Sequence, residues 1–401
     1  MPTAPDPARF PLTDEVRALG AAIAQAGGRP ILVGGWVRDC LLNHPHSKDF
    51  DLEVFGMAPE KLRAVLGRFG SVHAVGKHFG VLKLVAQGQE FDVSVPRRES
   101  KTGKGHKGFW VEPDPTMTFE QAASRRDFTI NAMGYDFLGQ AFLNPFHGWE
   151  DLEARQLRHV GPAFGEDPLR VLRAMQFAGR FGLTILAETQ AICREQDLEE
   201  LPRERIWEEV KKLMLRAPSP AHGWNYAEDL GVLKVFPELA RLKALPPTGA
   251  DSRTPWAHTL ATIDAVAALS DVSEDRLHLC MAALCHELGR TVVTRPDASF
   301  DTDLAKAAVE PAQSLIMRLT NEVGVTKAVV PLVRELPSVQ ALWSRREANM
   351  DPEVRRLALR VPVEPLLHLT QARHAASGAI GESPAVAWLR AAASRLGVLA
   401  G

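Results

Sequence analysis

The first hundred residues alternate between helical and strand-like patterns of apolar positions. Apolar residues recur at helical spacing after Thr13, a residue type that caps helices, and this pattern stops at Gly27. Short apolar runs bounded by turn residues then predict buried strands with helices between them. The alternation predicts a small α/β unit with strands at 31–33, 50–55, 79–85 and 90–95 and helices at 37–42 and 59–69.

From about residue 164 onward the pattern changes to successive helical periods with no convincing strand. Proline-rich breaks at 217–220 and 244–255 are the expected joints between helical domains. Residues 101–118 combine glycines and prolines with Lys and His side chains, which indicates a mobile loop. The sequence therefore predicts an N-terminal mixed sheet followed by an all-helical remainder.

Composition narrows the class of protein. A chain of 401 residues with 45% hydrophobic and 24% charged residues suggests two to four folded domains. Its net charge of -2 argues against a protein that coats polyanions, so a nucleic-acid partner would need a local basic face. The four cysteines form no Cys-X-X-Cys pair, and we find neither a signal peptide nor a membrane segment, which together indicate a cytoplasmic protein.

Two carboxylates, Asp49 and Asp51, stand on either side of Phe50 at the start of a predicted strand. Because strand side chains alternate between faces, both carboxylates share one face while Phe50 packs into the core. Two carboxylates on one face repel each other unless a divalent cation lies between them. Mg²⁺ prefers oxygen ligands of this kind. A lone Asp-X-Asp is also typical of a solvated strand end, so the metal interpretation depends on the neighbouring motifs.

A glycine pair stands sixteen residues before this strand and is suited to phosphate binding. Gly34 and Gly35 end one strand and open a helix in which Arg38 lies one turn further on. Glycine lets the backbone approach a triphosphate, and a helix N-terminus favours negative charge. An ordinary β–α turn is the structural alternative.

A third cluster, Arg125, Arg126 and Asp127, also combines groups that bind nucleotides. Guanidinium groups bind phosphate oxygens bidentately, and an aspartate accepts a hydrogen bond from a ribose hydroxyl. An Arg-Asp arrangement capping a helix is an equally good interpretation of this cluster alone.

Together the three clusters resemble the motifs of class II nucleotidyltransferases, a family of CCA-adding enzymes and bacterial poly(A) polymerases. The resemblance is dense from about residue 30 to 240 and rests on segments 32–39 with 48–51, 125–132, and 164–173. It implies that Asp49 and Asp51 are catalytic and hold Mg²⁺. It further implies a nucleotide site formed by Gly34, Gly35, Arg38, Arg125, Arg126, Asp127, Asp167, Arg170 and Arg173. One departure is Gln176, where some relatives carry a further arginine.

The resemblance also implies an architecture. The fold class is α+β, with an N-terminal mixed five-stranded nucleotidyltransferase head followed by an all-helical neck, body and tail. The expected domains are the catalytic head at 1–140, a neck for base recognition at 141–220, a body at 221–300, and a tail without an assigned role at 301–401.

The segment 164–173 suggests how bases are chosen without a template. Asp167 precedes Pro168 and is the expected N-cap of a helix on which Arg170 and Arg173 follow at three-residue spacing. Cytosine and adenine both present an amine donor beside a ring-nitrogen acceptor. A carboxylate beside a guanidinium complements that pattern, although a capped helix with a surface ion pair remains the alternative.

Further along, the segments around His258 and His286-Glu287 resemble the first two motifs of HD-type metal phosphohydrolases. The His-Asp dyad of that family is His-Glu here, and we find no later His-His pair or closing aspartate in the sequence. We therefore expect a degenerate domain that serves as a scaffold.

The predicted function is the addition of CMP and AMP to the 3′ end of tRNA, with CTP and ATP as donors. The alternatives are an enzyme that adds only CC or only A, a poly(A) polymerase of the same family, a phosphohydrolase, and a silent tRNA-binding scaffold.

Asp92 is a candidate third carboxylate that we leave outside the core site, and the basic residues between Glu204 and Arg216 are candidates for tRNA contact. The sequence leaves the oligomeric state open.

Overall fold

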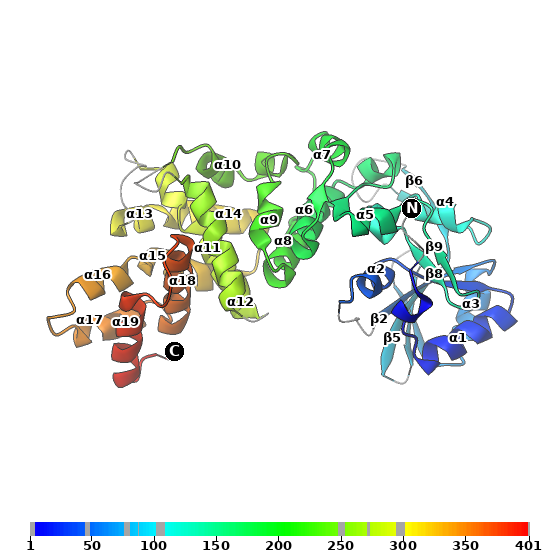
Figure 1. Ribbon diagram of the computed structural model, residues 1–401, viewed down its shortest axis with the longest axis horizontal. Coiled ribbons are helices and arrows are strands. Elements are labelled where there is room, and N and C mark those ends of the chain that lie inside the picture. The colour runs from blue at the N-terminus through cyan, green and yellow to red at the C-terminus, as the bar shows by residue number, and fades with distance from the viewer. Residues whose placement is uncertain are drawn as a thin grey trace. The chain divides into compact units, whose positions relative to one another are not determined.

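The computed structural model describes residues 5–44, 49–75, 81–86, 88–101, 109–247, 253–270, 273–293 and 301–399. The chain divides into two compact units, which can be followed in Figure 1, where the ribbon is coloured by residue number. The N-terminal unit comprises residues 1–170 and 184–192, and the C-terminal unit comprises residues 171–183 and 193–401. Among the helices in these ranges, none is long and apolar enough to cross a membrane.

The N-terminal unit is built on a mixed sheet of seven strands in the order β3-β4-β5-β2-β1-β8-β9. Strands β2 and β5 run parallel, and the other neighbouring pairs are antiparallel. The α+β fold class is thus confirmed, but the sheet has seven strands where five were expected. Its strands are β1 (Arg29–Val33), β2 (Asp49–Phe55), β3 (Ser71–Val75), β4 (Val81–Ala86), β5 (Gln89–Ser94), β8 (Gly134–Asp136) and β9 (Ala141–Leu143).

Helices pack on both faces of this sheet. On one face the ring of Phe50 lies 5.5 Å from that of Trp36 and 5.7 Å from that of Phe91, so Phe50 is in the core as predicted. On the other face Ile31 packs in a buried cluster with Phe119. The helices of this unit, not all of which lie on the sheet, are α1 (Asp14–Gln25), whose N-cap is Thr13 as expected, α2 (Gly35–Leu41), α3 (Pro59–Leu66), α4 (Phe119–Ala123), α5 (Gly148–Glu153) and α7 (Ala187–Arg194), which belongs to it up to residue 192.

Two short sheets correct the sequence-based expectations. Strand β7 (Phe109–Pro113) pairs antiparallel with β6 (Arg97–Lys101), so the expected loop at 101–118 contains a strand, and residues 102–108 lie outside the described residues. Strand β11 (Thr184–Ile185) pairs parallel with β10 (Gln156–Leu157), within the region expected to be all-helical. A two-residue strand carries no readable alternation, which is why the pattern did not predict it.

The C-terminal unit consists of helices and their connections, with no strand among its described residues. Helix α12 (Glu274–Cys285) is buried on every side over residues 279–285, as expected for a segment whose residues are all apolar. The buried Arg276 on α12 donates to the carbonyls of Met214, Ala217 and Ala267 at 2.6–3.3 Å, and so satisfies the last turns of two neighbouring helices. The remaining helices are α6 (Leu169–Phe181), α8 (Arg203–Arg216), α9 (Pro220–Asn225), α10 (Pro237–Lys243), α11 (Pro255–Leu269), α13 (Thr302–Ala307), α14 (Val309–Leu319), α15 (Val323–Glu335), α16 (Ser338–Ser344), α17 (Asp351–Ala358), α18 (Val363–Ala376) and α19 (Pro384–Arg395).

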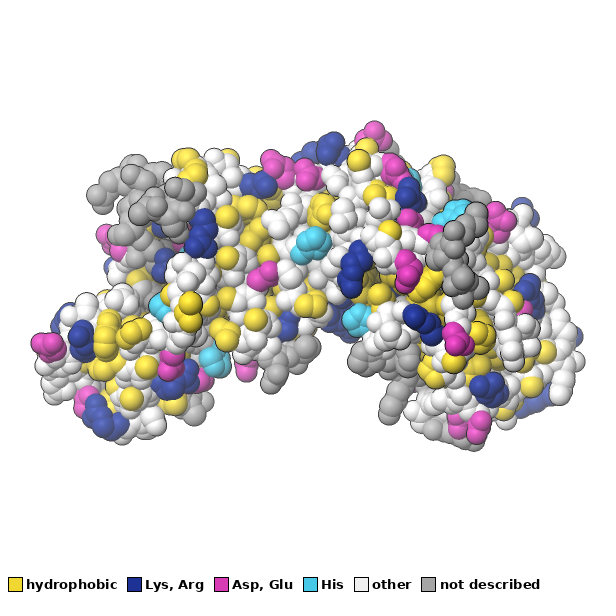
Figure 2. Space-filling view, in the orientation of Figure 1, with side chains coloured by type: hydrophobic (Ala, Val, Ile, Leu, Met, Phe, Trp, Pro, Cys, Tyr) yellow, Lys and Arg dark blue, Asp and Glu magenta, His cyan; other side chains and the backbone are white. Residues whose placement is uncertain are grey.

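Basic and acidic side chains are interspersed on the face drawn in Figure 2. On α8, the helix expected to carry clustered positive charge, Lys211 lies 2.6 Å from Glu208 and Lys212 lies 2.8 Å from Glu209. These ion pairs reduce the positive field that the sequence alone suggests for this helix.

Candidate active site

The turn between β1 and α2 requires glycine and lies beside a carboxylate. Gly34 has a φ of 68°, in the left-handed region that favours glycine. A Cβ at this position would lie 3.0 Å from Nη1 of Arg126 and 3.7 Å from Oδ2 of Asp51. The turn therefore brings together three of the predicted clusters, since Gly34, Asp51 and Arg126 are neighbours in space.

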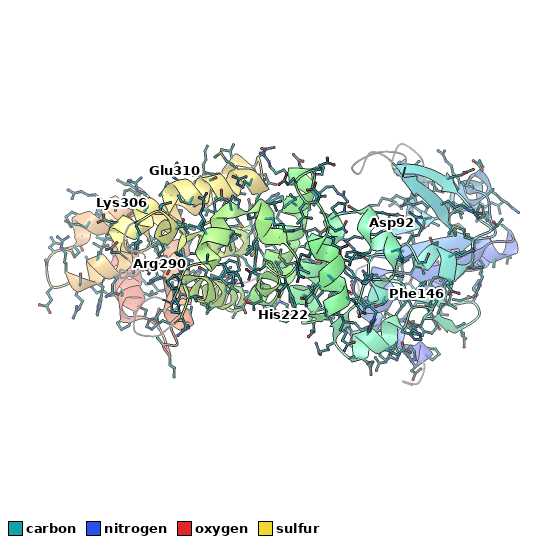
Figure 3. All side chains as sticks on the ribbon, turned by 90° about the horizontal axis from the view of Figure 1, so that it is seen from above. Asp92, Phe146, His222, Arg290, Lys306 and Glu310 are labelled. Atoms are coloured by element: carbon teal, nitrogen blue, oxygen red, sulfur yellow. The ribbon has the colours of Figure 1, made fainter. Side chains whose placement is uncertain are left out.

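Carboxylates from two strands share one face of the sheet next to this turn. In the parallel pair β2–β5, Asp51 is the register partner of Asp92, so the two side chains project from neighbouring positions. Asp49, the first residue of β2, is paired with Glu90; its side chain lies outside the described residues. Figure 3 labels Asp92, which was left outside the predicted core site because an aspartate on a surface strand was an equally good interpretation.

Two contacts position the guanidinium group of Arg126. Its Nη2 lies 3.3 Å from Oε2 of Glu53, two residues after Asp51 on the same face of β2, and its Nη1 donates to the carbonyl of Asn131 at 3.3 Å. The half-buried guanidinium is thus fixed beside the carboxylate strand. A guanidinium in this position is suited to the phosphate groups of a nucleotide.

A buried hydrogen-bond network joins the glycine turn to the Arg-Arg-Asp segment. Nη1 of Arg38 donates to Oδ1 of Asn131 at 2.6 Å, and Nδ2 of Asn131 donates to Oδ1 of Asp127 at 2.9 Å. Arg38 also pairs with Asp39 at 2.6 Å. Sequence reasoning assigned no role to Asn131, although its place in the segment 125–132 was a signal. Its amide contacts both Arg38 and Asp127, so it sets their relative positions.

The segment before α6 is tied to the same region. Arg125 forms an ion pair with Glu166 at 2.5 Å. Arg170 donates to the carbonyls of Ala163 and Arg125, at 2.6 and 2.7 Å. Oδ1 of Asp167 accepts the backbone N–H of Leu169 at 3.1 Å, which agrees with the expected capping position.

Arg173, three residues beyond Arg170 on α6, contacts two residues of the C-terminal unit. It lies 3.9 Å from Oε1 of the buried Glu209 on α8, and its guanidinium lies over the ring of Phe177. Gln176, the departure noted in the sequence, is 2% exposed, and its Nε2 has no hydrogen-bond partner among the described residues.

The HD-like segments also come together, in the C-terminal unit. Nδ1 of His258 lies 3.1 Å from Oε1 of Glu287, and Nε2 of His286 lies 3.5 Å from the same oxygen. Within the part of the chain that the structure describes, these three side chains form a group whose ligand atoms are close enough to hold a metal ion.

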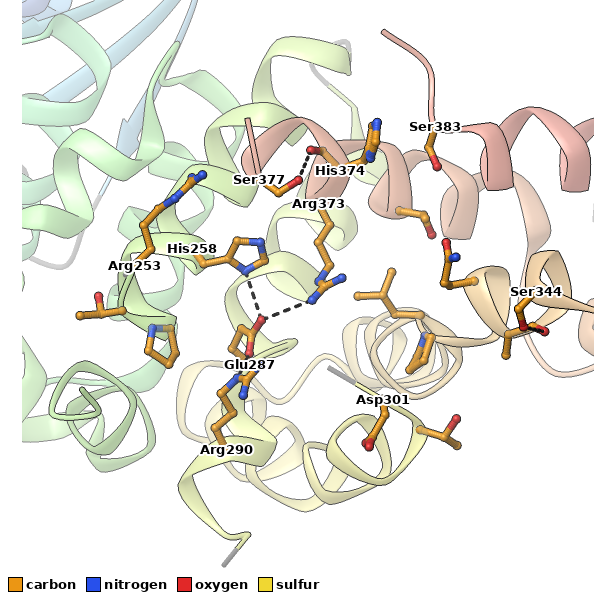
Figure 4. A pocket seen from close by; sticks show the side chains of 18 residues that line it. Arg253, His258, Glu287, Arg290, Asp301, Ser344, Arg373, His374, Ser377 and Ser383 are labelled. Atoms are coloured by element: carbon orange, nitrogen blue, oxygen red, sulfur yellow. Dashed lines mark hydrogen bonds and ion pairs between the residues drawn. The ribbon is translucent and has the colours of Figure 1, made fainter. Parts of the chain in front are cut away.

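Two arginines share the carboxylate of this group. Nε of Arg290 pairs with Oε2 of Glu287, and Nη2 of Arg373 lies 3.8 Å from Oε1 (Figure 4). Burial raises the pKa of Glu287, but the hydrogen bond from His258 and the neighbouring cations outweigh it, so the pKa lies well below its ordinary value. Burial lowers the pKa of His286 to about 3, so this imidazole is neutral at pH 7. Sequence reasoning missed Arg373 because it stands far along the chain from Glu287.

Two family descriptions match the chain. The family described as "Poly A polymerase head domain" matches residues 31–158. The family described as "Probable RNA and SrmB- binding site of polymerase A" matches residues 182–243. The first match covers the glycine turn, both carboxylate strands and the Arg-Arg-Asp segment.

The chain is similar to proteins called multifunctional CCA proteins and, in structure, to CCA-adding enzymes. A "Multifunctional CCA protein" of Pasteurella multocida (strain Pm70) is 37% identical over 298 residues, which cover 72% of this chain and 69% of the relative. The protein of the same name from Actinobacillus pleuropneumoniae serotype 5b (strain L20) is 38% identical over 300 residues, covering 72% and 70%. A solved structure of a Thermotoga maritima CCA-adding enzyme complexed with tRNA has a TM-score of 0.65 at 19% identity, covering 96% of this chain and 83% of that chain. This structural similarity confirms the fold class.

Proposed function

The chain belongs to the multifunctional CCA protein family of tRNA nucleotidyltransferases, and we propose that it adds CMP and AMP to the 3′ end of tRNA to complete CCA. The observation that carries the proposal is the juxtaposition of Gly34, Asp51 and Arg126, with Asp92 in register beside Asp51. A carboxylate, a guanidinium group of the kind that binds phosphate and a glycine turn lie together there, which supports a nucleotide site.

The family depends on a divalent metal, and we propose that Mg²⁺ is held by Asp49 and Asp51, with Asp92 as a neighbouring carboxylate. The oxygen donors fit a hard cation, because Asp51 and Asp92 project from adjacent positions of parallel strands. When bound, the metal stabilises charge on the transferring phosphoryl group. Arg126 and Arg38 orient the triphosphate, the tRNA 3′-hydroxyl attacks the α-phosphorus, and pyrophosphate leaves.

We propose that Asp167 and Arg170 read the base edge, with Arg173 one turn further along α6. Supporting this, Arg170 is anchored by the carbonyls of Ala163 and Arg125, which directly precedes Arg126 in the chain. Asp127 is a candidate for the ribose hydroxyl, held in place by Asn131. A site that pairs a carboxylate and a guanidinium with cytosine or adenine leaves buried groups unpaired when uracil or guanine enters.

We further propose the division into a catalytic head at 1–140, a neck at 141–220, a body at 221–300 and a tail at 301–401. The head family matches residues 31–158 and the second family matches 182–243, so the two matches support separate head and neck segments but extend past the proposed boundaries at 140 and 220. The substrates CTP, ATP and tRNA are cytoplasmic, and we propose that compartment as the site of action.

The test is an extension assay on end-labelled tRNA that lacks CCA. Incubation with CTP alone, ATP alone, and both should give additions of two, zero and three nucleotides respectively. Addition that stops at two nucleotides with both donors indicates a CC-adding enzyme, and extension only of tRNA already ending in CC indicates an A-adding enzyme. A long adenylate product from ATP alone would instead identify a poly(A) polymerase.

The His258 and His286 group is not proposed as a hydrolase, because two arginines lie on its one carboxylate. We expect no hydrolysis of a 2′,3′-cyclic phosphate in the presence of Mg²⁺, Mn²⁺ or Ni²⁺. Robust hydrolysis that disappears in His286→Ala would contradict this expectation.

A further inference from the structure

The segment that precedes α1 contacts both ends of α2, the helix that follows the glycine turn. Nη1 of Arg9 donates to the carbonyl of Leu41, the last residue of α2, at 3.1 Å. The ring of Phe10 lies 6.2 Å from that of Trp36, the second residue of α2. Because α2 carries Arg38 of the proposed triphosphate site, contacts at the two ends of this helix bear on nucleotide binding.

A helix as short as α2 depends on contacts of this kind. It has seven residues, and isolated helices shorter than about 12 residues are only marginally stable in water. Its N-cap is Gly34, which has no side chain to bond the first N–H groups of the helix. The stability of α2 therefore depends on packing and on partners for the carbonyls of its last turn.

The four carbonyls of that last turn all have partners. Those of residues 38–40 accept backbone N–H groups of residues 42–44 at 3.0–3.2 Å. The fourth, that of Leu41, accepts from Arg9, which stands 32 residues earlier in the chain. A guanidinium group also suits the negative end of the helix dipole. Arg9 therefore completes the hydrogen bonding of this helix end.

Phe10 packs the other end of α2 onto the sheet. The ring of Phe10 is 3% exposed and stacks on that of Tyr135 in β8, with the centroids 4.2 Å apart and an interplanar angle of 18°. The ring of Trp36 lies 6.2 Å from that of Phe10 and 5.5 Å from that of Phe50, which separates the two aspartates of β2. A continuous group of aromatic rings thus joins the segment before α1, helix α2 and the carboxylate strand.

Arg9 also contacts α5, which supports the partner of the α2 arginine. The guanidinium carbon of Arg9 lies 5.7 Å from the ring centroid of Trp149, the second residue of α5. Asp151 of the same helix accepts from the hydroxyl of Thr129 at 2.7 Å, and Thr129 begins the short helix that ends at Asn131. Because Asn131 accepts from the α2 arginine, Arg9 contacts the two helices that support this hydrogen bond.

The segment is ordered by its own sequence. Pro7 restricts the backbone, and Oδ1 of Asp6 accepts a backbone N–H group two residues further on at 2.9 Å, which caps a short 3-10 turn. The N–H groups of Arg9 and Phe10 close this turn on the carbonyls of Asp6 and Pro7, at 2.9 and 3.1 Å. A turn formed locally reduces the conformational entropy that is lost when the two side chains pack against α2.

We propose that Arg9 and Phe10 are positioning residues, which fix the orientation of α2 and thereby hold Arg38 where a triphosphate binds. Arg9 acts through the helix, because its contact lies six residues, or about 9 Å, from the start of α2 at the glycine turn. When either contact is lost, a smaller fraction of the protein has α2 in the binding orientation, so the apparent affinity for the nucleotide falls. The kinetic consequence rests on the proposed nucleotidyl transfer.

The kinetic test uses Arg9→Ala, because Arg9 is exposed and its removal leaves the core intact. We expect the KM for CTP and for ATP to rise about three-fold or more, as for loss of a hydrogen bond from a charged group, while kcat changes less than about two-fold. Arg9→Lys keeps a cation at the end of α2 and should recover part of the loss. Arg63→Ala, at an exposed arginine of α3, is the matched control and should leave KM unchanged.

Hydrogen exchange of peptides from α2, measured without nucleotide, tests the same contacts independently of activity. We expect exchange of residues 35–42 to be about three-fold faster or more in Arg9→Ala and in Phe10→Leu, which keeps an apolar side chain but removes the ring stack. Arg63→Ala should exchange as the wild type does.

The two measurements separate this inference from the proposed function. A wild-type protein that adds no nucleotide would contradict the proposed function, and the exchange of α2 would still decide whether Arg9 and Phe10 order this helix. Unchanged exchange in both variants would overturn the inference. Faster exchange with unchanged KM in an active enzyme would overturn it as well, because α2 would then be loosened without any effect on the nucleotide.

Discussion

The two units use the same side chains, carboxylates and arginines, in opposite arrangements. In the N-terminal unit, Asp51 and Asp92 project side by side, and Arg126, which lies next to Gly34, pairs with a further carboxylate of β2, Glu53. In the C-terminal unit, a single carboxylate, Glu287, is enclosed by two guanidiniums. The first arrangement concentrates negative charge and suits a cation, whereas the second leaves an excess of positive charge. Residue types alone would not separate the two sites.

The largest effect that we expect comes from removing a carboxylate of the first site. Asp51→Ala should lower nucleotide addition at least about 100-fold, because electrostatic stabilisation of the reacting phosphate is lost. Asp49→Ala should do the same. Both variants should keep the wild-type circular dichroism spectrum, since removal of one carboxylate relieves repulsion.

Single-turnover incorporation of CMP and AMP by each variant measures the effect. Glu287→Gln in the C-terminal unit is the matched control and should leave the rate unchanged. Activity of Asp51→Ala within about ten-fold of wild type would mean that this carboxylate does not hold the metal.

A second, smaller effect concerns selectivity. Asp167→Ala or Arg170→Ala should reduce the preference for CTP and ATP over UTP and GTP by about ten-fold or more, because a mispaired buried polar group is what rejects the wrong base. Steady-state incorporation of all four nucleotides gives the ratio. A preserved ratio with lowered overall activity would instead assign Asp167 to helix capping, which its bond to the N–H of Leu169 already supports.

The outline of the N-terminal unit was predictable because its signals are local. Thr13 caps α1, and the apolar runs at 31–33 and 50–55 lie in β1 and β2. Strand β8 was not predicted, because it has three residues, all of them buried, and begins with a glycine. A Cβ on Gly134 would lie 2.6 Å from the ring of Phe119, so this glycine is explained by packing between segments distant in sequence.

The candidate sites could be predicted from the sequence only where their residues lie close together along the chain. Asp49 and Asp51 stand two residues apart, so alternation along one strand relates them. Asp92 joins them through strand register, which is a long-range property. Likewise the HD-like segments drew attention to His258 and Glu287, but the charge around Glu287 depends on Arg373, which α18 contributes.

A third prediction concerns the network behind the active site. Asn131→Ala removes the amide that joins Arg38 to Asp127, and we expect the KM for CTP and ATP to rise about five- to ten-fold, as for the loss of one hydrogen bond to a charged group. The carboxylates are untouched, so kcat should change less than KM. Asn144→Ala, which removes a hydrogen bond to Glu150 in the same unit, is the control. A fall in kcat with constant KM would place Asn131 in the chemical step instead.

The last prediction concerns how the stability of the C-terminal unit depends on pH. It does not involve nucleotide addition at pH 7. Burial lowers the pKa of His286 to about 3 from 6.5, so below pH 6.5 the unfolded state binds a proton that the folded state does not. Stability of the C-terminal unit must therefore fall as the pH is lowered from 6.5 towards 3, by up to about 1.4 kcal/mol per pH unit for one proton. The pKa of Glu287 is lowered from 4.5, and protonation of this carboxylate adds a further loss of stability below pH 4.5.

Hydrogen exchange of peptides from α12, corrected for the intrinsic rate, measures the stability of this unit alone. We expect His286→Asn to flatten the slope between pH 6.5 and 4.5, whatever its effect on absolute stability. His147→Asn, at an exposed histidine of the N-terminal unit, should leave it unchanged. An equal slope in His286→Asn and wild type would show that His286 is protonated in the folded protein, and the net charge around Glu287 would then have to include it.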